Sequence, residues 1–565
     1  MTEDITLYLT DWQYNAGIVG LVNILGRENI TIAEQSITFS SDLLKDFQDK
    51  YFNFFIDTYQ KTLSWDKIIS YQKKIDKFEE NKFEKFTEKE LDYLNKYIKD
   101  TVKYYLKSAS YKAAYPLIDP TVDPLLWIKD LNTVGKLTKK ETFTEKRTEI
   151  IAEVQAVFEQ LKPIIAYCNS ELGRKYLAGK NVIYTVIRKG WDGVSFLFRQ
   201  TKIPDMYLDY ESYFLSELPE YQAEKEKYKF QCSNCNQPMK NYKNDLNFLN
   251  QTGFDTNRKT SHVWDFNNDI GVCPMCKMVY SCLPAGFTYA YQQGMFINAN
   301  TSVKMLVDVN QVMQKNVLNP IDETALTETS PYVALVHGIQ GELNKGTKYD
   351  LAEIQVVRYE DESYRFSLLS KPTLKVIYES KKQLDSLIKA GFREINTSFS
   401  LYKLVMQRLF NNENLFTLIH KTLVYKLSNV SNLYYQSFHI DQMLTINTYF
   451  LRGIGKMEQL STKQVSYARY FGENFKELYK KKSNERKIIG ISYRLLNALK
   501  TSNRDLFMDV LLNCCSYLGI EVPALFLKSF ESDEQFKTLG YSFVSGMIGL
   551  KSATPTTQNT ESAGE

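Results

Sequence analysis

Histidine is scarce in this chain, and several common catalytic motifs are missing. The 565 residues include four histidines, and no two of them have the spacing of a metal-binding pair. The sequence contains no Walker loop, no His-Glu-x-x-His, no Gly-x-Ser-x-Gly and no dinucleotide-binding glycine fingerprint. Because histidine is a common general base and metal ligand, this composition disfavours histidine-based catalysis. We therefore expect a protein that is not an enzyme.

A basic leader and long hydrophobic runs are also missing. The chain begins with Met-Thr-Glu-Asp, which is acidic, and no apolar run approaches the roughly 18 residues that span a bilayer. Eight cysteines in 565 residues do not make a disulfide framework. Cys168, Cys514 and Cys515 lie in apolar helical patterns, which indicates buried thiols. We expect a cytoplasmic protein, and its length implies several domains.

Four of the cysteines form two Cys-x-x-Cys pairs, Cys232 with Cys235 and Cys273 with Cys276. Their neighbours include Asn, Gln, Ser, Gly and Pro, which are typical of turns. Two such pairs can hold one ion in a tetrahedral shell of four sulfur atoms, the arrangement that structural zinc prefers. Because four protein ligands leave no position for a catalytic water, the pattern predicts a structural Zn²⁺ site.

The spacing between the two pairs is long. They are separated by 37 residues, whereas zinc ribbons usually have about 15 to 20. We therefore expect the intervening chain to form a projecting finger or loop. His262 and Cys282 are nearby alternative ligands, although neither has the spacing of a second pair and each is more simply an ordinary loop or core residue.

Positive charge is concentrated in the C-terminal part. Residues 401–550 contain 19 basic and 12 acidic side chains, whereas residues 1–400 contain 50 and 52. Such an excess suits a phosphate backbone, and a solvated helix face is an equally simple interpretation. The candidate nucleic-acid contacts in this cluster are Lys480, Lys481, Lys482, Arg486 and Lys487.

Hydrophobic periodicity predicts an α+β multidomain fold. Residues 5–9, 30–32 and 37–39 have strand patterns, and Asp11 is placed to cap a helix. Residues 182–187, Val-Ile-Tyr-Thr-Val-Ile, favour another strand, and a basic turn follows at 188–193. Residues 353–359 and 364–369 predict a hairpin. From about residue 397 apolar residues recur every three or four positions, which predicts a helical bundle.

These patterns divide the chain into five parts. They are an N-terminal α+β domain (1–225), a zinc-binding four-cysteine insertion (226–290), a β-rich segment (291–395), a C-terminal helical bundle (396–550) and a disordered tail (551–565).

Together these features resemble a known family. The opening residues 10–25, Thr-Asp-Trp-Gln-Tyr-Asn-Ala-Gly-Ile-Val-Gly-Leu-Val-Asn-Ile-Leu, the two cysteine pairs, the strand pair within 353–374 and the helical C-terminus are similar to the large subunit of the type I-B CRISPR surveillance complex (Cascade), in its Cst-type branch with a zinc finger. The opening block and the cysteine pairs are the most specific parts of the resemblance, while the bundle matches in architecture alone.

The resemblance implies a non-catalytic role in antiviral defence. Large subunits of this kind recognise the protospacer-adjacent motif (PAM) in duplex DNA and support R-loop formation. The implied partners are the guide RNA with its backbone subunits, the target DNA and a helicase-nuclease that cuts it. The bundle would be small-subunit-like, and an internal start at Met443 or Met406 could produce it separately.

The family's motif-reading residues cannot be matched position by position, so the candidates come from charge and shape. They are Arg188, Lys189, Arg199 and Lys202 around the glycine turn, and Arg258, Lys259 and Trp264 on the zinc insertion. Solvated loop charges are the simpler interpretation of each. Two alternatives for the whole chain are a zinc-ribbon RNA- or nucleotide-processing enzyme and a zinc-stapled scaffold without nucleic-acid contact.

Overall fold

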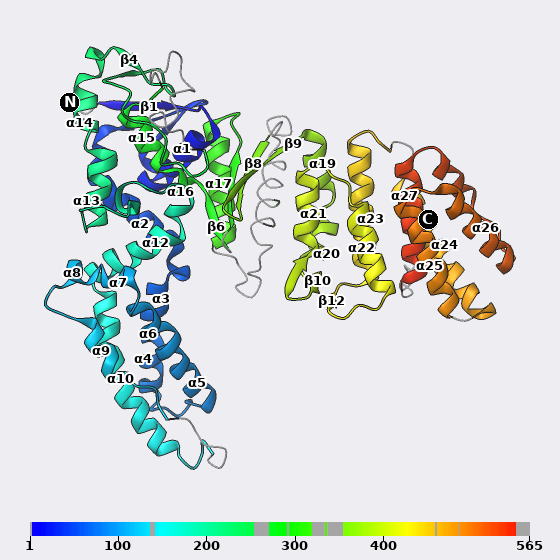
Figure 1. Cartoon of the computed structure of the whole chain (residues 1–565), viewed down its shortest axis with the longest axis horizontal. Coiled ribbons are helices and arrows are strands. Elements are labelled where there is room, and N and C mark those ends of the chain that lie inside the picture. Colours follow the sequence, from blue (N-terminus) through cyan, green and yellow to red (C-terminus); the bar gives the residue numbers. More distant parts are fainter. Residues whose placement is uncertain are drawn as a thin grey trace, which may run out of the picture. The chain divides into compact units, whose positions relative to one another are not determined.

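The computed structural model of the chain describes residues 3–135, 142–252, 270–290, 293–318, 333, 336, 354–457, 460–483 and 485–549. The chain divides into two compact units (Figure 1). Unit 1 comprises Met1–Asn319 and Val357–Arg365, and unit 2 comprises Pro320–Val356 and Phe366–Glu565. Helices predominate and the strands form small sheets, which confirms the predicted α+β class. In the described part of the chain, every helix is too short or too polar to cross a lipid bilayer.

Unit 1 begins with strand β1 (Asp4–Tyr8) and helix α1 (Trp12–Leu25), as the sequence predicts. The Asp11 carboxylate caps α1 by accepting hydrogen bonds from the backbone N–H groups of Gln13 and Tyr14. Strand β1 pairs antiparallel with β3 (Ser36–Ser40), which pairs with β2 (Thr31–Ile32). Because α1 is buried on nearly all sides, it lies at the centre of the hydrophobic core of this unit.

Glycines allow α1 to lie very close to α15 (Pro274–Ser281) and α16 (Leu283–Gly286). A Cβ atom on Gly20 would lie 2.0 Å from the carbonyl oxygen of Cys282, and one on Gly286 would lie 2.0 Å from that of Ala16. Any side chain at these positions would collide with backbone. Helix α15, whose N-terminus holds the second cysteine pair, and helix α16 are therefore tightly packed against the N-terminal helix.

The other helices of unit 1 lie between these two segments and after them. They are α2 (Phe47–Tyr59), α3 (Ser64–Ile69), α4 (Gln72–Glu80), α5 (Glu88–Lys96), α6 (Lys103–Leu106), α7 (Ala109–Lys112), α8 (Tyr115–Ile118), α9 (Pro124–Asp130), α10 (Arg147–Asn169), α11 (Glu171–Gly173), α12 (Gly179–Thr185), α13 (Met206–Tyr210), α14 (Leu218–Glu224) and α17 (Val303–Leu318).

The predicted strand at residues 182–187 is wrong, because the chain there forms α12 and the start of a 3-10 helix, η6 (Ile187–Lys189). The β-branched residues favoured a strand in isolation. However, Val182, Ile183, Val186 and Ile187 are all buried, and this spacing places them on one side of a helical turn. Burial of that side against the core outweighs the local strand preference.

A four-stranded sheet has the order β6-β7-β8-β9. Its strands are β6 (Thr288–Ala290), β7 (Gln293–Asn298), β8 (Ile354–Glu360) and β9 (Ser363–Leu369). Strands β8 and β9 are the predicted hairpin, and their connection contains Asp361 and Glu362 with φ of 50° and 58°. Positive φ at both central positions is the backbone of a tight two-residue hairpin turn.

Unit 2 is mainly helical. Its elements after β9 are α19 (Lys371–Glu379), α20 (Lys381–Leu387), β10 (Gly391–Glu394), β11 (Thr397–Ser400), α21 (Leu401–Phe410), α22 (Phe416–Leu427), β12 (Leu433–Tyr434), α23 (Ser437–Gly453), α24 (Thr462–Lys482), α25 (Glu485–Lys500), α26 (Arg504–Leu518), the 3-10 helix η13 (Ala524–Phe530) and α27 (Asp533–Ile548). Strands β11, β10 and β12 form a small sheet in that order. Helices α24 and α27 lie side by side (Figure 1).

Candidate metal centre

The first cysteine pair lies in a short hairpin of unit 1. Strand β4 (Phe230–Gln231) pairs with β5 (Pro238–Met239), and Cys232 and Cys235 lie in the connection. The Cys232 N–H donates to the carbonyl oxygen of Gln237 at 2.9 Å, and the Asn236 N–H donates to that of Cys232 at 3.0 Å. Asn236 has a φ of 58°, which asparagine tolerates better than most residues. This tight turn brings the two sulfur atoms together.

The second pair lies at the N-terminus of α15. Cys273 is the N-cap, and its Sγ accepts a hydrogen bond from the Cys276 N–H at 3.4 Å. Pro274 occupies the first turn, where its fixed φ suits a helix and its missing N–H is not needed. Because the first N–H groups of a helix carry partial positive charge, this position offsets part of the cost of negative charge on these sulfur atoms.

The four sulfur atoms converge on one point. The Sγ atoms of Cys232, Cys235, Cys273 and Cys276 all lie within 4.8 Å of one another, and those of Cys235 and Cys273 are 3.7 Å apart. A tetrahedral zinc ion with Zn–S bonds of about 2.3 Å requires sulfur atoms about 3.8 Å apart. The four cysteines can therefore hold a metal ion, and the set is consistent with zinc. Among the residues that the structure describes, these four cysteines form the cluster of side chains that could bind a metal ion.

Several groups donate hydrogen bonds to the sulfur atoms. The Cys273 N–H donates to Cys232 Sγ at 3.2 Å, and the Asn234 side-chain amide donates to Cys276 Sγ at 3.5 Å. The Cys276 thiol donates to the hydroxyl of Tyr14, on α1, at 3.6 Å, and when Cys276 is a thiolate the hydroxyl becomes the donor. Donors placed in this way stabilise negative charge on the sulfur atoms and fix their orientation.

The proximity of the thiols separates their pKa values. Hydrogen bonds from the other three thiols, that of Cys235 first, lower the pKa of Cys232. Contacts with Cys232 first and then Cys235 raise the pKa of Cys273 and of Cys276, and burial adds to the increase. Four thiolates therefore cannot form together without a compensating positive charge. A divalent cation supplies that charge, so full deprotonation and metal binding are coupled.

The N-terminal block forms the surroundings of this centre. The Thr10 hydroxyl donates to the Asn234 side-chain oxygen at 2.8 Å, and the Tyr280 hydroxyl donates to Asp11. Asp11 thus caps α1 and also connects it to α15. Burial, with a smaller contribution from Cys276, raises the pKa of Tyr14, so its hydroxyl stays protonated and can donate to the sulfur. The centre is therefore continuous with α1 rather than a separate module.

Sequence reasoning identified the four ligands but not their supporting residues. Asp11 was recognised only as a helix cap, and nothing in the sequence pairs it with Tyr280, 269 positions away. Tyr14 lies on a helix whose burial was predictable, but the partner of its hydroxyl was not. The one available signal was Asn234, because it lies between two ligands and carries a side-chain amide.

The insertion between the cysteine pairs does not project freely in its described parts. Asn250 N–H donates to the carbonyl oxygen of Gly190 at 3.1 Å, and Asp192 N–H donates to that of Phe248 at 3.0 Å. Trp191 is fully buried beneath this segment. The expected projecting loop is therefore wrong for residues 236–252. Arg258, Lys259 and Trp264, together with His262, lie outside the described residues.

The glycine-turn candidates have different surroundings. Arg188 is exposed and its Nε lies 2.9 Å from the Asp192 carboxylate. The Lys189 ammonium lies 5.0 Å from the centre of the Tyr289 ring, and burial lowers the pKa of Lys189 to about 8. Arg199 and Lys202 are exposed. The structure therefore places Lys189 against the core and the other three on the surface.

The basic cluster of unit 2 lies where α24 ends and α25 begins. Lys480, Lys481, Lys482, Arg486 and Lys487 are all exposed. The Lys482 ammonium also donates to the carbonyl oxygen of Leu518 at 2.9 Å, at the C-terminus of α26. A cation at this position stabilises the helix end, so Lys482 has a structural role.

Cys282, the alternative ligand that the structure describes, and two of the histidines have other contacts. Cys282 is buried, and its Sγ donates to the carbonyl oxygen of Met278 at 3.4 Å, outside the four-sulfur cluster. His439 Nδ1 accepts a hydrogen bond from the Gln436 N–H at 2.8 Å and caps α23. His420 lies 3.3 Å from the Tyr541 hydroxyl. Each of these side chains therefore contributes to local structure.

Comparison with known proteins gives one match. Residues 225–288 match the family described as CRISPR-associated protein (Cas_CXXC_CXXC), and this segment contains all four cysteines. No curated protein and no solved structure gives a significant match. The family match indicates a CRISPR-associated protein.

Proposed function

We propose that this protein is the non-catalytic large subunit of a type I-B CRISPR surveillance complex, of the Cst-type branch, and that its four cysteines bind Zn²⁺. The observation that carries this proposal is the family match over the cysteine pairs. The hydrogen bonds between those pairs and residues 10–15 support it, because the resemblance to the large subunit rests on the same two segments.

In this function the protein recognises the PAM in duplex DNA and supports R-loop formation. Guide RNA and the target strand form base pairs, while the protein contacts backbone and groove. Arg188, Arg199 and Lys202 are exposed in unit 1 and suited to phosphate or base-edge contacts. The exposed cations at the end of α24 suit the displaced strand. A helicase-nuclease recruited to the open complex then cuts the DNA in the cytoplasm.

Zinc in this function has a structural role. A shell of four thiolates fills the tetrahedral coordination of the ion and leaves no position for an activated water. The ion joins the β4–β5 hairpin to α15, which is packed against α1. Elemental analysis of the purified chain should give one zinc per molecule, and another metal or none would contradict this assignment.

An internal start could yield the helical part of unit 2 as a separate small subunit. Met406 lies in α21 and Met443 in α23. A start at Met443 removes Asp441, whose carboxylate lies 2.9 Å from Arg469 and accepts a hydrogen bond from Ser545. A start at Met406 keeps all of α23 and these contacts. We therefore favour Met406, and a C-terminal epitope tag with each Met codon replaced in turn tests this.

The test of the proposed function is affinity purification of the full chain from its native cells. Copurified RNA is sequenced and proteins are identified by mass spectrometry. We expect short repeat-spacer RNAs and backbone subunits. A chain recovered without RNA from cells that express such guides would contradict the proposal, and turnover of RNA or nucleotides by that isolated chain would favour the zinc-ribbon enzyme.

A further inference from the structure

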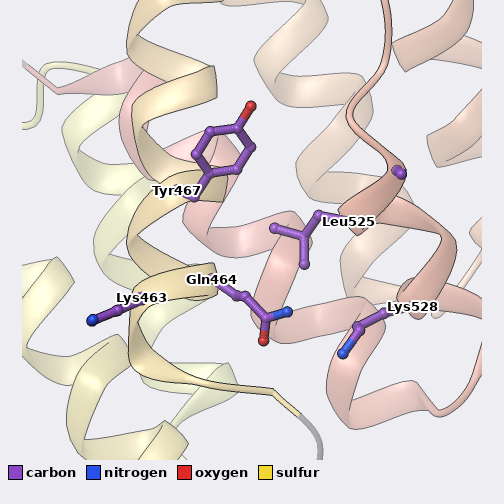
Figure 2. Close-up of a pocket in the computed structure, with 6 residues that line it drawn as sticks. Lys463, Gln464, Tyr467, Leu525 and Lys528 are labelled. Atoms are coloured by element: carbon purple, nitrogen blue, oxygen red, sulfur yellow. The ribbon is translucent and has the colours of Figure 1, made fainter.

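A groove lies between α24 and η13 in unit 2, away from the basic cluster at the end of α24. Its volume is about 440 Å³, and it is lined by Lys463, Gln464, Tyr467, Ala524, Leu525 and Lys528. Figure 2 shows Gln464 and Tyr467 extending from one side and Leu525 and Lys528 from the other. The groove is therefore lined by an aromatic ring, two aliphatic side chains, an amide and two lysines.

The three-residue period of η13 explains its side of the groove. Residues three apart share a face of a 3-10 helix. Phe526 and Ser529 are buried, and the Phe526 ring lies 5.9 Å from that of Phe471 on α24. This anchor directs Leu525 and Lys528, one position earlier on each turn, into the groove. The wall is thus held in place by the core of unit 2.

The opposite wall is the exposed face of α24. Val465 and Ala468 are buried, while the Tyr467 side chain is 50% exposed and Tyr470, nearly one turn further on, is 62% exposed. Lys463 lies one turn before Tyr467, and its ammonium points away from Lys528 in Figure 2. The groove therefore has one lysine on each wall, and the two ammonium groups do not point toward each other.

We propose that this groove binds one base of a single-stranded nucleic acid, with Tyr467 stacking on the base. Leu525 and Ala524 contact its other apolar surface, and Lys463 and Lys528 contact phosphates on either side. The Gln464 side-chain oxygen accepts a hydrogen bond from the Ser461 N–H at 2.9 Å, so its amide nitrogen is the group that can donate to the edge of the base. The lining residues include two lysines and no acidic side chain, which favours an anionic ligand such as a nucleic acid. A duplex does not fit, because its bases are stacked on one another and cannot reach the ring. The inference deepens the proposed function and rests on it for the presence of a displaced strand.

Binding to the full-length chain tests the groove directly. The probe is a fluorescein-labelled oligothymidylate, and affinity is measured by anisotropy. Because base–aromatic stacking contributes about 1–3 kcal/mol, Tyr467→Ala should weaken binding about 5- to 150-fold. Tyr467→Phe keeps the ring and should bind like the wild type. Tyr434→Ala removes a tyrosine that is 57% exposed on β12 and serves as the matched control.

Photocrosslinking adds a readout that general loss of folding cannot produce. An oligonucleotide containing 5-iodouracil should crosslink to Tyr467 in the wild type, identified by mass spectrometry of the peptides. Equal affinity of wild type and Tyr467→Ala, or crosslinks that map elsewhere, would overturn the inference. Failure here leaves copurification with guide RNA unaffected, so the two proposals fail separately.

Discussion

The hydroxyl of Tyr14 connects α1 to the metal centre. It lies 3.6 Å from Cys276 Sγ, and outer hydrogen bonds to metal ligands usually contribute about 10- to 100-fold to affinity. Because this contact is long, we expect Tyr14→Phe to weaken zinc binding by about 10-fold. Competition with a chromophoric chelator measures the change. Tyr8→Phe, at a side chain 62% exposed, is the control, and an unchanged affinity in Tyr14→Phe would show that the hydroxyl does not support the ligand.

Asp441 is a partly buried carboxylate that joins three helices. It lies 2.9 Å from Arg469 on α24 and accepts a hydrogen bond from Ser545 on α27 at 2.8 Å. Glu473 also faces Arg469, at 2.8 Å. Burial raises the pKa of Asp441 from 3.8 to about 6, and Arg469 offsets only part of this increase. The protonated carboxyl is therefore more compatible with the folded state than the ionised one.

This pKa predicts the sign of a pH effect. A carboxyl with a raised folded pKa binds more protons in the folded state, so its contribution to stability declines as pH rises from about 4 to about 6. The stability advantage of the wild type over Asp441→Asn should shrink over that interval by up to about 3 kcal/mol. Urea unfolding at several pH values measures it. An advantage that grows with pH would mean that the pair with Arg469 dominates.

At the scale of elements, glycine contacts determine which helices pack closely. A Cβ atom on Gly472 of α24 would lie 2.0 Å from the carbonyl oxygen of Phe543 on α27, whereas one on Gly490 of α25 would meet nothing within 4 Å. We expect Gly472→Ala to destabilise unit 2 by about 3 kcal/mol through overpacking. Gly490→Ala should stabilise it by about 0.5–1 kcal/mol, because glycine is a poor helix former.

Thermal and urea unfolding of the two variants give the comparison. Both substitutions add one methyl group to a helix of the same unit, so their difference isolates the contact between α24 and α27. Similar stabilities would show that these helices can separate enough to accept a side chain, and that their close approach is not required.

At the scale of the whole molecule, the uneven charge distribution predicts where nucleic acid binds. Lys481 and Arg486 are exposed in the basic cluster of unit 2. We expect the double variant Lys481→Glu with Arg486→Glu to weaken DNA binding by the assembled complex. The slope of log affinity against log salt should also fall by about 0.7–0.9 for each lost phosphate contact.

A matched double variant controls for the change in net charge. Lys73→Glu with Lys112→Glu reverses two exposed charges in unit 1 and alters the total charge by the same amount. Equal losses in the two double variants would indicate a general electrostatic effect. No loss in the unit 2 variant would exclude the cluster from the binding surface.

Elements with strong local signals were predictable from the sequence. Asp11 caps α1, and the β8–β9 hairpin closes where a polar connection separates two strand patterns. The strand predicted at residues 182–187 was wrong, because β-branched content gives the same local preference whether or not neighbouring helices bury the segment. The free-energy difference that comes from secondary-structure propensity is small compared with the free energy gained by burying the apolar side of a helix.

The sequence alone determined the α+β class and the four sulfur ligands, since both depend on residue type and spacing along the chain. Tertiary structure decided what surrounds those ligands. Asp11 meets Tyr280 and Tyr14 meets Cys276 across the close contact between α1 and α15, where a Cβ atom on Gly17 would lie 2.4 Å from the carbonyl oxygen of Val279. The groove between α24 and η13 depends in the same way on the buried Phe526. Contacts between residues far apart in sequence follow from packing, which no local pattern encodes.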